Sequence, residues 1–443
     1  MSEPGSVRRL SVLGLLYVAQ GIVYGFGGFI LVPSLAAAGV SLQDQAGLLA
    51  LAGLPWVLKL VWAPLLDRFG GAGSGRARWF AAGAMVVMSI ALWGLASRPS
   101  LTAEPSTVAW LWLLVNAGLS LQDVATDALV IDRVPPGQRG VANGVLLGGH
   151  HLGVEGVGGL GLGLWVASGG LAAALWAQAA IMLVLAGAPL LLPRRANREP
   201  TGSSDTSPGD ASPGDASPGD ASPGEASPGE ASSGSAEQPP QAEGLRRVLV
   251  ELVRRRHSLA VAALAAVLMS ADVLTATISG QFWVQRLHWT VEELSTQLAP
   301  LLLVVNLLAY AGATGLVDRL GHARAAARGC AGLGLLWVGF GLVPTLWPSV
   351  AFMVVFVVFQ ALATAVFYVG IHAALMGATS PAIRASHFAV LMALLNLPRV
   401  LVPSAAPGVL DALGYSGLFV AAGAFQLLMA GAIGRVWPRS GAR

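Results

Sequence analysis

Asp67-Arg68-Phe69-Gly70 ends one apolar run of this sequence, and Asp318-Arg319-Leu320-Gly321 ends another, 251 residues later. Arg139 and Arg384, which are 245 residues apart, each begin a further apolar run. Two nearly equal offsets indicate that the chain is an internal repeat of two halves. Repeated halves with a binding site at their interface are typical of secondary transporters.

The composition excludes a soluble globular protein. Of the 443 residues, 55% are hydrophobic and only 11% are charged, whereas a soluble domain carries about 25% charged residues. The net charge of only +3 also argues against a nucleic-acid binder. The single cysteine, Cys330, excludes an internal disulfide framework and a zinc cluster built on cysteines. We expect no cleaved signal peptide, because the first apolar run is too long for one.

Twelve apolar runs each have the roughly 20 residues that a helical membrane span needs. Their approximate limits are 10–36, 45–67, 78–97, 107–131, 140–166, 170–192, 257–283, 294–317, 325–343, 348–377, 384–409 and 415–437. Many of the 56 glycines fall within these runs, as suits close helix packing in lipid. We therefore predict an all-α integral membrane protein with twelve transmembrane helices in two six-helix pseudo-symmetric bundles.

A polar stretch separates the sixth apolar run from the seventh. Residues 207–231 repeat Ser-Pro-Gly-Asp/Glu-Ala five times, a composition that cannot bury a core. We predict an N-terminal six-helix bundle over residues 1–192, a disordered cytoplasmic linker over 193–244 and a C-terminal six-helix bundle over 245–443. A plain tether is the favoured role of the linker, ahead of partner docking or phosphorylation.

The distribution of basic residues predicts the orientation. If the N-terminus faces the cytoplasm, 22 of the 26 basic residues fall in cytoplasmic segments. Only Arg98 and Arg286 fall in outer loops, while Lys59 and Arg399 lie inside spans. The positive-inside rule therefore predicts that both termini are cytoplasmic. Because low Lys with high Ala, Gly and Arg indicates a GC-rich bacterium, we expect a multi-pass protein of the bacterial inner membrane.

The two D-R-x-G motifs, each followed by arginines after the second and eighth runs, resemble the loop signature of major facilitator superfamily transporters. In that family, the Asp and Arg latch the cytoplasmic ends of neighbouring helices in the outward-open state. The resemblance implies a conformational latch formed by Asp67, Arg68, Asp318, Arg319 and Arg324. The glycine that usually stands four residues before the Asp is Ala63 in one copy and Thr314 in the other.

A narrower resemblance covers about a quarter of the chain. Leu58-Lys59-Leu60-Val61-Trp62-Ala63-Pro64-Leu65-Leu66-Asp67-Arg68 resembles the L-K-x-x-W-A-P-L-x-D-R stretch of AmpG-type muropeptide permeases. Gln122-Asp123-Val124-Ala125-Thr126-Asp127-Ala128 resembles their Q-D-x-x-x-D-A element, and Arg139-Gly140 with Gly148 and Gly149 continues the match. The same elements occur in acetyl-CoA transporters and siderophore permeases. AmpG-type proteins often carry two extra spans, so twelve spans keep a siderophore permease in consideration.

Ionisable residues inside spans are costly, which makes them candidate functional residues. Lys59, the only lysine, lies eight residues before Asp67, and Asp123 lies nine residues before Asp132. At about 1.5 Å of rise per residue the two charges share a depth, so we predict a Lys59–Asp123 ion pair. Asp127 lies one turn farther on the same helix face. The Lys59–Asp123 pair is either functional or a structural pair that fixes helix packing. Asp127 is either functional, part of a structural pair of this kind, or a partner of Arg68 in the latch.

Asp272 and Arg399 form a second candidate pair. Asp272 lies sixteen residues after Arg256, and Arg399 lies fifteen after Arg384, in spans that run in the same direction. Their depths therefore agree, which predicts an ion pair. An arginine at this position could instead hold a substrate carboxylate or phosphate through two hydrogen bonds. The sequence leaves both alternatives open.

Glu155 has no cation at its depth, which makes it a candidate proton carrier. His151 lies one turn before it beside His150, and His372 is a further, weaker candidate. His151 and Glu155 have a spacing that can share a metal ion, but no second cluster completes a site. We expect no metal, no cofactor and no enzyme activity. The chain also lacks the Walker A motif of a nucleotide-driven transporter.

The remaining polar residues in the first, fourth, seventh and tenth runs should line a substrate cavity, because those spans do so in the superfamily. They are Gln20, Tyr24, Asn116, Gln122, Gln281, Gln360 and Tyr368. We expect Trp56, Trp62, Trp165 and Trp283 to serve packing or the membrane interface.

These observations predict a secondary active transporter that imports a bulky polar or amphiphilic solute by proton symport and alternating access. The resemblance places a muropeptide first, a ferric siderophore second and a drug-type efflux substrate third. A membrane receptor or scaffold that has lost transport is the alternative from another class. The partners of the predicted transporter would be the solute, protons and the lipid bilayer, with no nucleic acid. We expect the transporter to be a monomer.

Overall fold

The computed structural model describes residues 4–59, 76–101, 103–134, 138–192, 254–379 and 384–437, and every regular element in these ranges is a helix. The elements before residue 193 are α1 (Pro4–Gly25), η1 (Phe26–Leu31), α2 (Val32–Ala37), α3 (Leu42–Val57), α5 (Ala77–Ala96), α6 (Pro105–Arg133), α7 (Arg139–His151), η3 (Leu152–Gly161), α8 (Leu162–Leu185) and η4 (Ala188–Leu191). The elements after residue 253 are α10 (Arg256–Leu268), α11 (Ser270–Gln281), η5 (Phe282–Arg286), α12 (Val291–Glu293), η6 (Leu294–Leu298), α13 (Ala299–Leu320), α14 (His322–Leu342), η7 (Pro344–Leu346), α15 (Val350–Gly377), α16 (Arg384–Asn396) and α17 (Pro398–Val436). The predicted linker lies outside the described residues.

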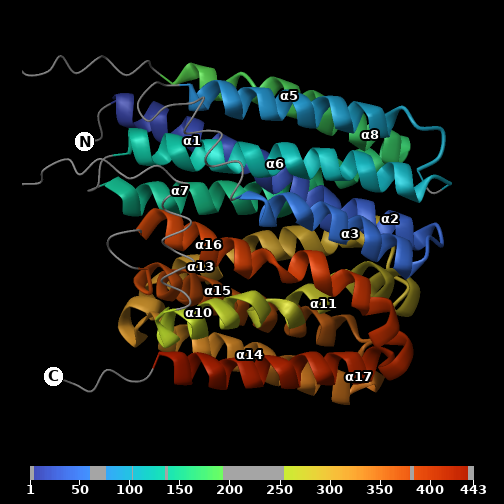
Figure 1. Cartoon of the computed structure of the whole chain (residues 1–443). Coiled ribbons are helices and arrows are strands. Elements are labelled where there is room, and N and C mark those ends of the chain that lie inside the picture. Colours follow the sequence, from blue (N-terminus) through green and yellow to red (C-terminus); the bar gives the residue numbers. More distant parts are fainter. Residues whose placement is uncertain are drawn as a thin grey trace, which may run out of the picture.

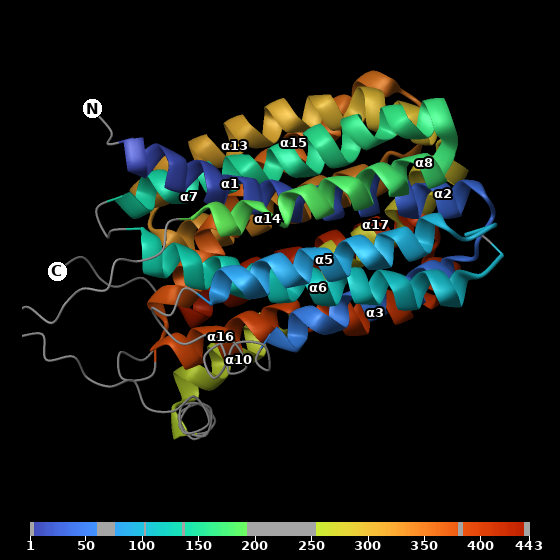
Figure 2. The same cartoon turned by 90° about the horizontal axis from the view of Figure 1, so that it is seen from above.

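The long helices run along one common axis (Figures 1 and 2). In Figure 1 the elements before residue 193 lie above those after residue 253, and α1 begins and α17 ends at the left. We call these two groups of helices the N-half and the C-half. Separate apolar clusters fill the two halves, one centred on α1, α5 and α6 and another on α10, α14 and α16.

Among the described residues, nine helical segments are long and apolar enough to cross a membrane. Two of these segments, Val141–Leu191 and His387–Val436, are interrupted at Gly170 and Gly414. Their φ values of 77° and 63° lie in the left-handed region that glycine adopts without strain. Gly414 falls between two predicted runs and Gly170 is the first residue of one, so each interruption marks a predicted boundary. The predicted run 45–67 continues into residues outside the description. The all-helical class is confirmed, while the number twelve stays a prediction.

Large apolar side chains cover the outward faces of the helices. Trp93 is 56% exposed, Trp110 62% and Val184 76%. A soluble protein rarely leaves such side chains in water as one contiguous surface, whereas the hydrocarbon of a bilayer solvates them. Trp165 is also exposed, as an interface role requires.

The halves meet at several helix contacts, and two of them border the candidate site. In the first, α3 packs against α17, and a β-carbon on Gly53 would lie 2.5 Å from the Arg399 carbonyl oxygen. In the second, η3 and α8 pack against η6 and α13, and a β-carbon on Gly163 would lie 2.2 Å from Cβ of Ser295. Glycine is therefore needed for the backbones to approach so closely, as small residues allow in membrane proteins. We call the second contact the η3–α13 seam.

Candidate functional site

Lys59 and Asp123 form an ion pair, which confirms the prediction from their matching depths. Lys59 lies just beyond the end of α3, and Asp123 lies on α6. The Lys59 ammonium also sits 4.5 Å from the ring centroid of Trp56, a cation–π contact. Nε1 of Trp56 in turn donates to Oδ1 of Asn116 on α6 at 3.5 Å. These contacts tie α3 to α6 and neutralise both charges.

Asp127 is exposed and lies one turn beyond Asp123 on α6. Its carboxylate accepts a hydrogen bond of 3.0 Å from the Tyr17 hydroxyl on α1. Arg68, the structural partner considered for Asp127, lies outside the described residues. The structure therefore connects Asp127 to α1, and its pairing with Arg68 stays a prediction.

A central cavity of about 310 Å³ lies between the halves, bordered by α1, α3, α6, α11 and α17. Its polar lining comprises Tyr24, Asn116, Asp272, Thr277, Ser279 and Arg399. Tyr24 and Asn116 thus border a cavity, while their predicted contact with a substrate stays a prediction. Trp56 and Trp112 also line it, so Trp56 does more than the packing expected of it.

The predicted Arg399–Asp272 ion pair does not form. Instead, the Asp272 carboxylate accepts a hydrogen bond of 2.8 Å from the Tyr368 hydroxyl on α15. No described carboxylate lies within ion-pair distance of the Arg399 guanidinium, although Asp272 and Tyr24 are near enough to interact with it electrostatically. Matching depth did not place the two side chains face to face, because depth does not fix the direction in which each helix turns its side chain. The positively charged Arg399 side chain therefore borders the central cavity without an ion-pair partner among the described carboxylates.

Glu155 has two partners, one of which, Asn306, the sequence did not indicate. Its side chain is buried, and Oε1 accepts a hydrogen bond of 2.8 Å from Nδ2 of Asn306 on α13. Nδ1 of His151 lies 3.3 Å from Oε2. Glu155 therefore has described partners, and its role as a proton carrier stays a prediction. An amide within the otherwise apolar stretch Leu301–Ala309 was the available sequence signal for Asn306.

Glu155 lies in η3, a π-helical segment of ten residues. Such segments are rare and occur frequently at functional sites. Across the seam, the ring of Tyr310 on α13 packs against His151, with 4.7 Å between the centroids. His150 faces the other way and contacts the ring of Tyr24 at 5.6 Å. The histidine pair thus connects the η3–α13 seam with the central cavity.

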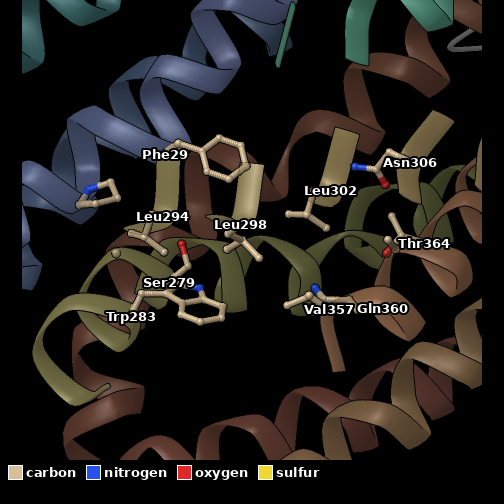
Figure 3. Close-up of a pocket in the computed structure, with 14 residues that line it drawn as sticks. Phe29, Ser279, Trp283, Leu294, Leu298, Leu302, Asn306, Val357, Gln360 and Thr364 are labelled. Atoms are coloured by element: carbon tan, nitrogen blue, oxygen red, sulfur yellow. The ribbon is translucent and has the colours of Figure 1, made fainter. Parts of the chain in front are cut away.

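A second cavity, which we call the side cavity, has a volume of about 340 Å³ (Figure 3). Asn306 and Thr364 lie toward the right end of this view, Ser279 and Trp283 toward the left, and Leu298 and Leu302 between them. Phe29 and Gln360 also line it, while a role of Gln360 in substrate binding stays a prediction. Trp283, expected in packing or at the membrane interface, lines a cavity. Gly28 and Ser279 border both cavities, which therefore adjoin.

Three of the predicted cavity glutamines lie elsewhere. Gln20, Gln122 and Gln281 are buried and border neither cavity. Nε2 of Gln122 donates to the Leu16 carbonyl oxygen at 3.1 Å and so fastens α6 to α1. A position in the expected span was not enough for Gln122, because its side chain points toward α1.

Two further predicted residues lie on α15. Tyr368 is occupied by its hydrogen bond to Asp272. Nδ1 of His372 lies 2.8 Å from the Tyr368 carbonyl oxygen of its own helix. Neither residue borders the two cavities. Among the described residues, no three His, Cys, Asp or Glu side chains gather as a metal site requires.

The predicted latch is described only in its second copy. Asp318 and Arg319 end α13, Arg324 begins α14, and all three are exposed. None of them forms an ion pair with another described side chain. Asp67 and Arg68 lie outside the described residues, so the latch stays a prediction.

The sequence model of a family described as Major Facilitator Superfamily matches residues 13–346 of the chain. The chain is also 28% identical over 207 residues to proteins named anhydromuropeptide permease, from Escherichia coli K12 and O157:H7. That match covers 45% of this chain and only 39% of the length of each permease. Family and relatives are transporters, not enzymes.

Solved structures share the fold over nearly the whole chain. The nucleoside transporter NupG superimposes with a TM-score of 0.67 at 12% identity, covering 98% of this chain and 100% of its own. A bacterial homologue of the human lysosomal transporter Spinster, in an inward-facing and occupied conformation, gives a TM-score of 0.66 at 16% identity. That match covers 98% of this chain and 97% of the homologue. At these identities the likeness shows the fold alone.

Proposed function

Because the chain belongs to the Major Facilitator Superfamily, we propose that it is a secondary active permease that imports an anionic, muropeptide-like solute together with protons. In this proposal, twelve transmembrane helices form two pseudo-symmetric halves, residues 1–192 and 245–443, tethered by the linker 193–244. The halves rock about the central cavity, which opens in turn to each side of the membrane.

Arg399 is the observation that carries the solute class. Its guanidinium borders the central cavity and has no ion-pair partner among the described carboxylates. A charge inside a membrane protein is costly unless something pairs with it. A solute carboxylate would supply that partner through two parallel hydrogen bonds. The peptide part of a muropeptide carries such carboxylates, and similarity to the anhydromuropeptide permease supports the same choice.

The size of the site supports an elongated solute. Each cavity alone is near the lower end of the roughly 300–1,000 Å³ range of small-molecule sites. The two adjoin at Gly28 and Ser279, so one solute can reach from Arg399 into the side cavity. The charged end would occupy the central cavity, and an uncharged end would lie along Trp283 and the leucines.

Proton coupling is assigned to Glu155 in this proposal. It is a buried carboxylate at a contact between the halves, with His151 beside it. Intramembrane carboxylates and histidines of this kind form proton relays in transporters. Asp123 and Asp127 on α6 are further candidate proton carriers in this proposal, and so is His372 on α15. A proton taken up from outside and released inside would drive import.

The proposed location is the bacterial inner membrane, with both termini in the cytoplasm and a monomer as the working unit. Asp67, Arg68, Asp318, Arg319 and Arg324 would latch the halves during the cycle. A receptor or scaffold would depend on the linker instead. Deletion of residues 201–243 separates the two ideas, because a transporter should keep its uptake and a scaffold should lose its activity.

The direct test is uptake of labelled anhydromuropeptide into right-side-out vesicles, with and without a protonophore. Uptake that the protonophore abolishes is the expected result. Absence of uptake, in vesicles shown to contain folded protein, would refute the muropeptide assignment, and ferric siderophores would then be the next solutes to load.

A further inference from the structure

Asn306 contributes both to the η3–α13 seam and to the lining of the side cavity. Its Nδ2 donates to Glu155 across the η3–α13 seam at 2.8 Å, and its side chain also lines the side cavity. An asparagine amide has two N–H donors and one carbonyl acceptor. Only one donor is used by a described residue, so the remaining donor and the oxygen are available to a molecule in the cavity.

The surroundings of Asn306 define what such a molecule would offer. Gln360 and Thr364 lie four residues apart on one face of α15 and line the same cavity. An amide, a second amide and a hydroxyl are uncharged groups that exchange hydrogen bonds with hydroxyls or amide carbonyls. The apolar side chains of Leu298, Leu302 and Trp283 continue the lining (Figure 3). This cavity therefore suits an uncharged group with hydroxyl or amide oxygens beside an apolar surface.

The bond between Asn306 and Glu155 is the described polar link across this seam. Asn306 belongs to the C-half and Glu155 to the N-half. His151 also contacts Glu155, but it lies one turn away on the same half and moves with it. Two further titratable side chains, Tyr310 and His150, meet His151 through ring packing. Farther along the seam, Gly159 and Gly163 approach Ala299 and Ser295 without any charged group.

We propose that the side cavity is a subsite for an uncharged hydroxyl- or amide-bearing group of the solute, and that Asn306 couples its occupancy to opening of the η3–α13 seam. A solute that binds both the free N–H and the carbonyl oxygen of Asn306 turns the amide toward the cavity, which takes the other N–H away from Glu155 Oε1. A buried carboxylate without a donor is costly, and opening the seam to water relieves that cost. The inference rests on the proposed transport function and adds a coupling residue to it.

The test measures the seam directly. Spin labels at Ser168→Cys on α8 and Glu292→Cys on α12, both exposed positions in opposite halves, report the distance by pulsed electron paramagnetic resonance in nanodiscs. Cys330, which is buried, is replaced by alanine in this background. Without solute, Asn306→Leu should at least double the long-distance population. Gln360 lines the same cavity, but no described contact joins it to Glu155. The distance distribution of Gln360→Leu should therefore match that of the wild type.

A second variant tests whether Asn306→Leu opens the seam only because it misfolds. Asn306→Gln keeps the amide on a longer stem and should recover part of the short-distance population. Wild-type distances in Asn306→Leu would overturn the proposal, and so would equal opening in Gln360→Leu, because the seam would then respond to the cavity lining in general.

The solute is tested in a separate arm. Anhydromuropeptide should lengthen the wild-type distance, and both Asn306→Leu and Gln360→Leu should raise the KM for its uptake about tenfold. If the wild type takes up no anhydromuropeptide, the proposed function fails, while the solute-free distances still decide the role of Asn306. Normal KM values in both variants, with normal wild-type uptake, would overturn the subsite.

Discussion

Lys59 and Asp123 form an ion pair that joins the end of α3 to the middle of α6, although 64 residues separate them in sequence. The pair lies inside the membrane-spanning bundle and is partly buried, with 24% and 12% of the two side chains exposed. Removing one partner of such a pair costs more than the pair itself contributes, because the other charge stays behind in a poorly solvated place.

Lys59→Ala should therefore lower uptake at least tenfold and cost roughly 1.5–3 kcal/mol of stability, the usual range for a hydrogen bond to a charged group. The double variant Lys59→Met/Asp123→Leu should recover the stability without the uptake. Thermal unfolding in detergent and vesicle uptake would measure the two effects. Arg98→Ala is the control, since the exposed Arg98–Glu104 pair at 3.7 Å should matter little. Normal uptake by Lys59→Ala would refute the functional role of the pair.

Arg399→Gln should raise the KM for an anionic solute at least tenfold while leaving the fold intact, because the site loses its charge and a bidentate donor. Arg399→Lys should be intermediate, since lysine restores the charge without the planar fork of donors. Initial rates over a range of solute concentrations would provide the comparison. An unchanged KM in Arg399→Gln would show that the solute does not meet this side chain.

Glu155→Gln should separate solute exchange from proton-driven accumulation. Glutamine has the size of glutamate and keeps an oxygen that accepts from Asn306, but it carries no exchangeable carboxyl proton. Counterflow between preloaded vesicles and labelled solute should persist, while accumulation should no longer depend on external pH. A pH dependence identical to that of the wild type would remove Glu155 from the proton path.

Gly28→Leu should block the junction of the two cavities. Gly28 borders both of them, and a β-carbon there would meet nothing within 4 Å, so the new side chain can fill the space without disturbing the fold. Uptake of anhydromuropeptide should fall at least tenfold. Gly47→Leu is the matched control, because Gly47 also has open space before it but borders neither cavity. Equal uptake by the two variants would contradict a solute that spans both cavities.

Sequence reasoning reached the helical class and the Lys59–Asp123 pair because hydrophobic run length and depth can be counted along one chain. It failed where the direction of a side chain decides the contact. Asp272 and Arg399 share a depth, yet Asp272 bonds to Tyr368. Gln122 lies in the expected span but points into α1.

The partner of Glu155 could not be derived from local pattern for a different reason. Asn306 lies 151 residues away in the other half, and only the packing of η3 against α13 brings the two together. The side cavity depends on the same packing, since its lining comes from both halves. Such sites form only when the two halves meet, so a sequence pattern within either half cannot specify them.

The central claim is that solute and protons enter together. Proteoliposomes that contain the purified protein and a trapped pH-sensitive dye would test it, with anhydromuropeptide added outside in the absence of any imposed gradient. We predict acidification of the interior that requires both solute and protein and is lost in Glu155→Gln. Uptake of the labelled solute by the same proteoliposomes without any change of internal pH would contradict proton symport.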